Sequence, residues 1–115
     1  MESISCAELK KLIEEKADYI LIDVREKIEL KNGIIPTSHH IPLQEFLKSL
    51  TISAEDFKKK HGFSLSKKDR LILYCRSGNR SEFATKMALK LGFNAENFVG
   101  SILEWSKHDP KVKSY

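Results

Sequence analysis

Cysteine is scarce in this sequence, and its spacing excludes two common uses of that residue. The 115 residues contain only Cys6 and Cys75, with no Cys-x-x-Cys pair, so neither a disulfide framework nor a zinc knuckle underlies the fold. Cys6, at the start of a predicted helix, is interpreted as an incidental thiol, with mild activation by the helix as the alternative. His39 and His40 are adjacent, which is poor spacing for one metal ion, and the other two histidines stand alone. We therefore expect no metal and no cofactor.

Long apolar runs and targeting segments are also lacking. No apolar stretch approaches the roughly 18 residues that cross a bilayer, so no membrane partner is expected. The first residues show neither a secretory signal nor the Arg-rich start of a mitochondrial leader, although a mature form would have lost such a leader. A cytoplasmic, reducing setting is the default expectation, with mitochondria as the alternative.

The composition that is present is typical of a soluble globular chain with one domain, residues 1–115. Apolar residues make up 41% and charged residues 31%, which excludes intrinsic disorder. The net charge of +4 comes partly from lysine runs at 58–60 and 67–68. No aromatic side chains interleave with these lysines, so they indicate a solvated surface and no nucleic-acid partner.

Short apolar runs alternate with helical patterns along the chain, which predicts an α/β fold with helices on both faces of a sheet. A Ser-x-x-Glu capping box at 5–8 begins the first helix. In the fourth helix Phe83, Met87 and Leu91 recur every four residues, with Ala84 and Ala88 beside them. The tail, about 107–115, is expected to fray. Strands are predicted at 19–22, 71–75 and 97–99, with a peripheral strand within 34–42. Helices are predicted at 6–16, 43–50, 54–61 and 101–107, with a helical turn at 26–31. The helix that contains Phe83, Met87 and Leu91 is predicted to end at 91.

Cys75 occupies the most informative position in the chain. It ends the apolar run 71–74 and precedes a glycine-containing loop, Arg76 to Ser81, and then a helix. Such a strand–loop–helix unit directs backbone N–H groups and the positive end of a helix dipole to one point. A cysteine held there beside two arginines should have a lowered pKa and act as a thiolate nucleophile on a small anion. The alternative is a buried, inert core cysteine.

The charged residues near this loop have alternative roles. Ligands of parallel sheets bind beyond the carboxyl ends of the strands, so Asp23 and Arg25 are expected to face the same pocket as the loop. Arg76 either binds an anionic donor or is a surface charge. Arg80 is expected to brace the loop through a carboxylate, with Asp23 and Glu26 as the candidates. Arg25 either forms a structural ion pair or lines the pocket.

Four segments, in order, resemble the rhodanese (sulfurtransferase) family. The resemblance covers nearly the whole chain and is greatest to stand-alone, single-domain members. A helical insert at 53–62 is similar to small eukaryotic thiosulfate sulfurtransferase-like proteins. One departure is Thr-Ser-His-His at 37–40, where relatives have a small Gly-Ala pair. The matching segments are Leu-Ile-Asp-Val-Arg-Glu at 21–26, Gly-Ile-Ile-Pro at 33–36 with Ile-Pro-Leu at 41–43, Cys-Arg-Ser-Gly-Asn-Arg-Ser at 75–81, and Gly-Phe at 92–93 with Gly-Ser-Ile-Leu-Glu-Trp at 100–105.

The resemblance implies a five-stranded, mainly parallel sheet. It also implies transfer of a sulfane sulfur from thiosulfate, or a related donor, to cyanide or to a thiol such as glutathione or thioredoxin. Cys75 matches the family's catalytic, persulfide-forming nucleophile. The loop matches the substrate-binding segment whose amides surround the terminal sulfur, and three charged residues are expected to support it from behind. The loop residues are Arg76, Ser77, Gly78, Asn79 and Arg80, and the supporting residues are Asp23, Arg25 and Glu26.

The length of the loop distinguishes two chemistries. Four residues separate Cys75 from Arg80, whereas the related cell-cycle phosphatases have one more. A phosphoryl group presents three oxygens to the loop amides and a persulfide presents one sulfur, so the shorter loop favours sulfur transfer. Two other interpretations stay open: a non-catalytic rhodanese module, and a carrier that passes persulfide sulfur to a partner protein. The retained cysteine and loop favour an enzyme.

Overall fold

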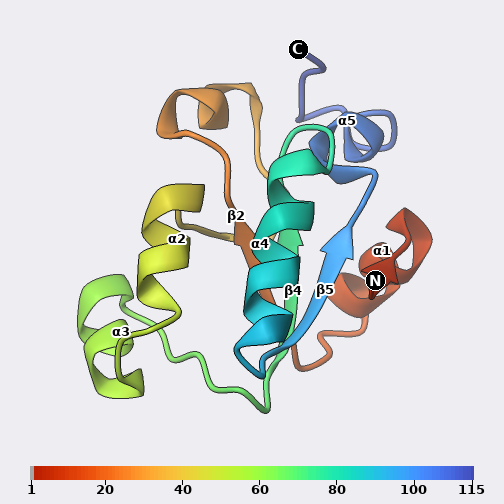
Figure 1. The fold of residues 1–115 in the computed structure, drawn as a ribbon. Coiled ribbons are helices and arrows are strands. Elements are labelled where there is room, and N and C mark those ends of the chain that lie inside the picture. The colour runs from red at the N-terminus through yellow and green to blue at the C-terminus, as the bar shows by residue number, and fades with distance from the viewer. Residues whose placement is uncertain (1) are drawn as a thin grey trace.

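The computed structural model describes residues 2–115, which form one sheet of five parallel strands (Figure 1). The order across the sheet is β1-β5-β4-β2-β3, and every neighbouring pair is parallel. The predicted five-stranded, mainly parallel α/β sheet is thereby confirmed. The strands are β1 Ser3–Ile4, β2 Ile20–Asp23, β3 His39–His40, β4 Arg70–Tyr74 and β5 Asn94–Phe98.

Helices cover both faces of the sheet because the central strand is apolar on both sides. Successive side chains of a strand point to opposite faces. Leu71 and Leu73 of β4 lie in the core shared with α2, α3 and α4, and Ile72 and Tyr74 lie in the core shared with α1 and α5. Figure 1 shows α4 crossing in front of β4. The helices are α1 Cys6–Glu14, α2 Leu43–Ser49, α3 Ala54–His61, α4 Asn79–Lys90 and α5 Ser101–Trp105, with a 3-10 helix, η1, at Lys27–Asn32.

The capping box predicted at 5–8 is confirmed, and α3 has caps of its own. Ser5 and Glu8 form the reciprocal capping box of α1, with each side chain accepting from the other's backbone N–H at 3.1 Å. Ser53 caps α3, and Gly62 ends it in the left-handed conformation at φ 80°. Local signals of this kind depend on residues three or four positions apart, so they are visible in the sequence.

The apolar stripe predicted for α4 is only partly buried. Phe83 and Leu91 are 50% and 39% exposed, whereas Ala84 and Ala88 are fully buried together with Ser81 and Thr85. The small side chains face the sheet, since they allow the helix axis to approach β4 and β5 closely, and the larger ones turn outward. The buried side of the helix is therefore centred on Ala84 and Ala88, with Met87 at its border, and not on Phe83 and Leu91.

The last strand is longer and earlier than predicted. Residues 97–99 were expected, but β5 spans Asn94–Phe98, and Val99 lies outside it. Asn94 and Glu96 are poor strand formers, so the sequence concealed this strand. Pairing with β4 stabilises β5, because the carboxylate of Glu96 accepts two hydrogen bonds from Arg70 of β4.

The C-terminal segment, expected to fray, packs against the domain. The side chain of Val112 is 5% exposed, and the Lys113 N–H donates to the carbonyl of Asn32 at 2.7 Å. Gly33 permits this approach: its φ is 110°, and a Cβ there would lie 2.9 Å from the Cα of Val112. Among residues 2–115, no helix has the length and apolar character needed to cross a membrane.

Candidate active site

Cys75 lies immediately after β4, where the chain turns into α4. Its side chain is 1% exposed. The Sγ atom accepts a hydrogen bond from the Gly78 N–H at 3.1 Å and another from the Ser81 hydroxyl at 3.4 Å. Gly78 is required for this turn, because its φ is 97° and a Cβ would stand 2.4 Å from the carbonyl oxygen of Val99. The loop therefore curls around a single atom, the cysteine sulfur.

The surroundings of Cys75 favour its thiolate. Burial alone would raise the pKa of the thiol. Hydrogen bonds from the Ser81 hydroxyl and from the backbone N–H groups of Ser81, Gly78 and Ser77 outweigh burial, and the pKa is lowered from its ordinary value. This is the electrostatic arrangement that the sequence predicts, although hydrogen bonds to the sulfur contribute more to it than the charges of the loop arginines do.

The segment from the end of β5 to the start of α5 fixes the backbone of Cys75 and its loop. The Cys75 N–H donates to the hydroxyl of Ser101 at 3.1 Å, and that hydroxyl donates to the carbonyl of Phe98 at 2.8 Å. The side-chain amide of Asn97 donates to the carbonyl of Gly78 at 3.2 Å. Sequence reasoning missed Ser101 and Asn97 as site residues. The only signal was that Ser101 falls in the segment 100–105, which resembles the family.

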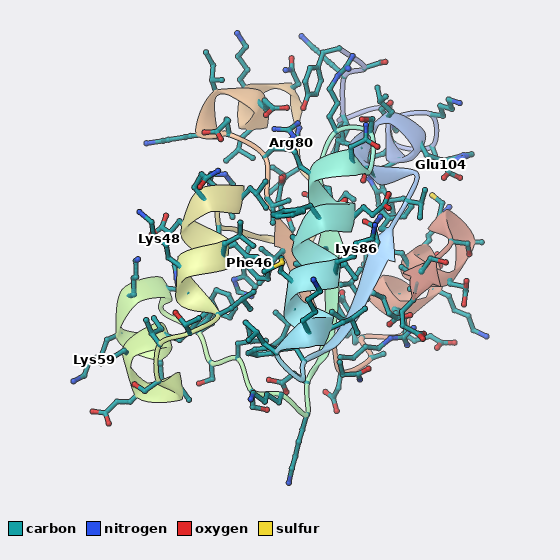
Figure 2. All side chains as sticks on the ribbon, in the orientation of Figure 1. Phe46, Lys48, Lys59, Arg80, Lys86 and Glu104 are labelled. Carbon is teal, nitrogen blue, oxygen red and sulfur yellow. The ribbon has the colours of Figure 1, made fainter. Side chains whose placement is uncertain are left out.

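Arg80 braces the loop, as expected, but its partner is a different carboxylate. Its guanidinium donates two hydrogen bonds to Glu29 of η1, at 2.6 and 2.9 Å. Figure 2 shows the Arg80 side chain between α4 and the η1 segment. Neither Asp23 nor Glu26 fills this role: Glu26 contributes its backbone N–H, which donates to the Glu29 carboxylate at 3.0 Å. Hydrogen bonding from Arg80 lowers the pKa of Glu29 to about 2.

Arg25 forms the structural ion pair that was one of its two predicted roles. Its guanidinium and the Asp23 carboxylate are fully buried and joined at 2.7 Å, with two further hydrogen bonds at 3.0 Å. It also donates to the carbonyl of Gly33 and to the hydroxyl of Tyr115, both at 2.9 Å. All the donors of such a buried cation need partners, and these contacts supply them. The Asp23–Arg25 pair thus has a structural role near the site, and it connects β2 to the C-terminal segment.

Arg76 differs from the other two arginines because it is not held by a carboxylate among the described residues. Its buried Nε lacks a hydrogen-bond partner there, and its guanidinium carbon lies 4.9 Å from the centre of the Tyr115 ring. Tyr115 in turn donates its hydroxyl proton to Glu29 at 2.7 Å. Sequence reasoning missed Tyr115, since it placed this residue in a frayed tail. The side chains of Ser77 and Asn79, also predicted to bind substrate, are exposed.

Fold and site together define a class: parallel α/β proteins in which a cysteine lies in a strand–loop–helix cradle that lowers the pKa of its thiol. Residues 5–108 match the family described as the rhodanese-like domain. The chain belongs to this family. Most of the domain is thus accounted for by one known architecture.

Individual relatives and solved structures agree with this assignment. The chain is 44% identical over 97 residues to the "Putative thiosulfate sulfurtransferase, mitochondrial" of Schizosaccharomyces pombe, covering 83% of this chain and 66% of the relative. It is 30% identical to the "Thiosulfate:glutathione sulfurtransferase" of Saccharomyces cerevisiae, over 94% of this chain and 80% of that one. The solved human single-domain sulfurtransferase TSTD1 superposes with a TM-score of 0.86 at 28% identity, covering 95% of this chain and 98% of the human one.

Proposed function

We propose that this rhodanese-like protein is a sulfurtransferase that carries a sulfane sulfur as a persulfide on Cys75. In the first step the Cys75 thiolate attacks the outer sulfur of thiosulfate, whose S–S bond breaks, and sulfite leaves with the bonding electron pair. In the second step an acceptor thiolate or cyanide attacks the outer sulfur of the persulfide. The acceptor persulfide or thiocyanate departs, and the Cys75 thiolate is regenerated.

The observation that carries this proposal is the convergence of hydrogen-bond donors on the Cys75 sulfur. The Gly78 N–H at 3.1 Å and the Ser81 hydroxyl at 3.4 Å point at one anionic atom. Fixed dipoles of this kind stabilise the Cys75 thiolate, which attacks the donor in the first step and leaves in the second, without reorganisation during the reaction. The short loop supports sulfur over phosphoryl chemistry, because a phosphoryl group needs amides spread around three oxygens.

Arg76 is proposed as the cation that binds the donor. Arg80 is neutralised by Glu29 and Arg25 by Asp23, so these two arginines supply position and little free charge. Arg76 follows the nucleophile directly and retains a buried Nε without a partner among residues 2–115. A dianion such as thiosulfate offers the oxygens that this donor needs. Thiosulfate is therefore the expected donor, ahead of 3-mercaptopyruvate.

A small thiol is the expected acceptor. The budding-yeast relative's name specifies glutathione, and we extend that acceptor class, with thioredoxin as the alternative, to this chain. A carrier that hands sulfur only to a partner protein is the remaining candidate, and steady-state turnover with thiosulfate and each free acceptor separates the two. A cytoplasmic location stays our prediction, with mitochondria as the alternative because the fission-yeast relative is named as mitochondrial. Imaging of the tagged protein in cells decides between these compartments.

Intact-protein mass spectrometry after thiosulfate treatment tests the proposal. Wild-type protein should gain one sulfur atom and lose it on addition of cyanide or thiol. Cys75→Ser should gain none, while the matched control Cys6→Ser should behave as wild type, because Cys6 has no such cradle. Sulfur retained by the Cys75→Ser protein would place the persulfide elsewhere.

A further inference from the structure

A second group of reactive side chains lies away from Cys75, where α1 meets α5. Cys6 begins α1, Glu104 lies in the last turn of α5, and His108 follows that helix. One ligand atom from each, Sγ of Cys6, a Glu104 carboxylate oxygen and an imidazole nitrogen of His108, lie within 4.8 Å of one another. Figure 2 shows Glu104 on the side of α5 that faces α1. The sequence analysis treated Cys6 and His108 as isolated, since only the fold brings them together.

The three side chains border a cavity that leaves room for a ligand. With Ala7 and Lys10 they line a space of about 250 Å³. Cys6 is buried, at 8% exposed, whereas His108 is exposed. Burial, and then the nearby Glu104 carboxylate, raise the pKa of the Cys6 thiol. A buried thiol beside a carboxylate and an imidazole is an arrangement that a divalent cation would stabilise.

We infer that Cys6, Glu104 and His108 form a zinc site with an open fourth position. Thiolate, imidazole and carboxylate are the ligands of Zn²⁺, whereas Mg²⁺ and Ca²⁺ prefer sets made of oxygen alone. Two ligand atoms on one tetrahedral Zn²⁺ are separated by roughly 3.4–3.6 Å. The three ligand atoms lie within 4.8 Å of one another, so binding would draw the side chains of Cys6, Glu104 and His108 closer together. Binding converts the Cys6 thiol to a thiolate and releases its proton to solvent.

Lys10 is the one feature of the cavity that opposes a cation. Its ammonium lines the same space, and it lowers the pKa of Cys6, although less than burial and Glu104 raise it. Lys10 lies in the exposed part of α1, and its long side chain is able to swing into solvent when the metal enters. Removal of this charge should therefore strengthen metal binding, which a purely structural role of the cluster would not produce.

The zinc site would be coupled to the sulfur site through α5. The first turn of this helix fixes the nucleophile: the Ile102 N–H donates to the carbonyl of Cys75 at 3.1 Å, and the Ser101 hydroxyl accepts from the Cys75 N–H. A metal that joins the last turn of α5 to α1 would restrain the whole helix. Because it binds only the folded chain, it would also raise the melting temperature.

Cobalt(II) absorption, with Zn²⁺ as competitor, tests the site independently of any sulfurtransferase activity. The experiment uses Cys75→Ser protein, in which Cys6 is the only thiol, so a sulfur-to-cobalt charge-transfer band can arise only there. We expect the band at one Co²⁺ per chain, its loss on addition of Zn²⁺, and a Zn²⁺-dependent rise in melting temperature.

Variants in the same background identify the other ligands. Loss of outer contacts around metal ligands costs roughly 10- to 100-fold in affinity, so His108→Ala and Glu104→Gln should each weaken binding by at least about 100-fold. Lys10→Gln should tighten binding, and His61→Ala, which removes a histidine bonded to Ser49, should leave it unchanged. Absence of the band, or unchanged affinity in the His108→Ala or Glu104→Gln protein, would overturn the inference.

Discussion

Replacement of Ser81 by alanine tests the electrostatic account of Cys75 directly. The Ser81 hydroxyl donates to the Cys75 sulfur at 3.4 Å and to the carbonyl of Gly78 at 3.2 Å. Because the hydroxyl is fully buried, water does not replace it when it is removed. The thiolate would lose one of its donors, while the backbone N–H of Gly78 would stay in place. The pKa of Cys75 should therefore rise part of the way back towards the ordinary value of a thiol.

The size of this rise follows from the geometry. A hydrogen bond to a charged group contributes about 1.5–3 kcal/mol. The Ser81 hydroxyl shares its proton between two acceptors, so the lower end of that range applies. One pKa unit corresponds to about 1.4 kcal/mol, and we expect the pKa of Cys75 to increase by about one unit.

The rate of alkylation by iodoacetamide against pH measures this shift, in Cys6→Ser protein so that one thiol reacts. The midpoint should move about one unit to higher pH in the Ser81→Ala protein. Thr85→Val is the matched control, because it also removes a fully buried hydroxyl, one helical turn later. The Thr85 hydroxyl donates to the Ser81 carbonyl at 2.7 Å and makes no hydrogen bond to the Cys75 sulfur. An unmoved midpoint in Ser81→Ala, or an equal movement in Thr85→Val, would refute the reasoning.

Three further predictions concern charge and loop size. Glu29→Gln should lower the free energy of unfolding by about 1 kcal/mol at neutral pH. Because the folded pKa of Glu29 is about 2, below its ordinary 4.5, this difference should persist above pH 4.5 and disappear as the pH falls towards 2, as urea unfolding at several pH values will show. Arg76→Ala should raise the KM for thiosulfate by roughly 10- to 100-fold through loss of a charged hydrogen bond, and an unchanged KM in steady-state assays would exclude Arg76 as the donor-binding cation. A glycine inserted between Ser77 and Gly78 should abolish sulfur transfer while circular dichroism remains native, and full activity of that protein would show that loop size does not select sulfur.

The nucleophile and its loop could be predicted from the sequence because their determinants are local. An apolar run, a cysteine, a glycine at the turn and a helix start follow one another within about a dozen positions, and Gly78 has the positive φ that such a turn requires. The side-chain partners could not be predicted in the same way. The sequence analysis named Asp23 and Glu26, and not Glu29, as candidate partners of Arg80. These three carboxylates lie within a few residues of one another, and only the path of η1 decides which one reaches Arg80.

Contacts between distant parts of the chain were the other gap. Tyr115 reaches Glu29 and Arg25 across most of the sequence, and no periodic pattern marks an isolated tyrosine in a polar tail. Ser101 was similarly hidden, because a serine that caps nothing in its own helix gives no local signal of its bond to the Cys75 N–H. Neither residue type is unusual, so the role of Tyr115 and of Ser101 can be recognised only from their positions in the folded structure.

The parallel pairing of β1 with β5 has a consequence for synthesis on the ribosome. Ser3 is aligned with Asn97, so the first strand of this sheet to be translated can pair only after the last strand of the sheet has been made. Pairings between distant segments also form slowly in folding. Asn97 and Ser101, which hold the loop and backbone around Cys75, emerge in the same late interval. A nascent chain therefore exposes this thiol before its complete cradle exists, and the nucleophile becomes fully organised only when the sheet closes.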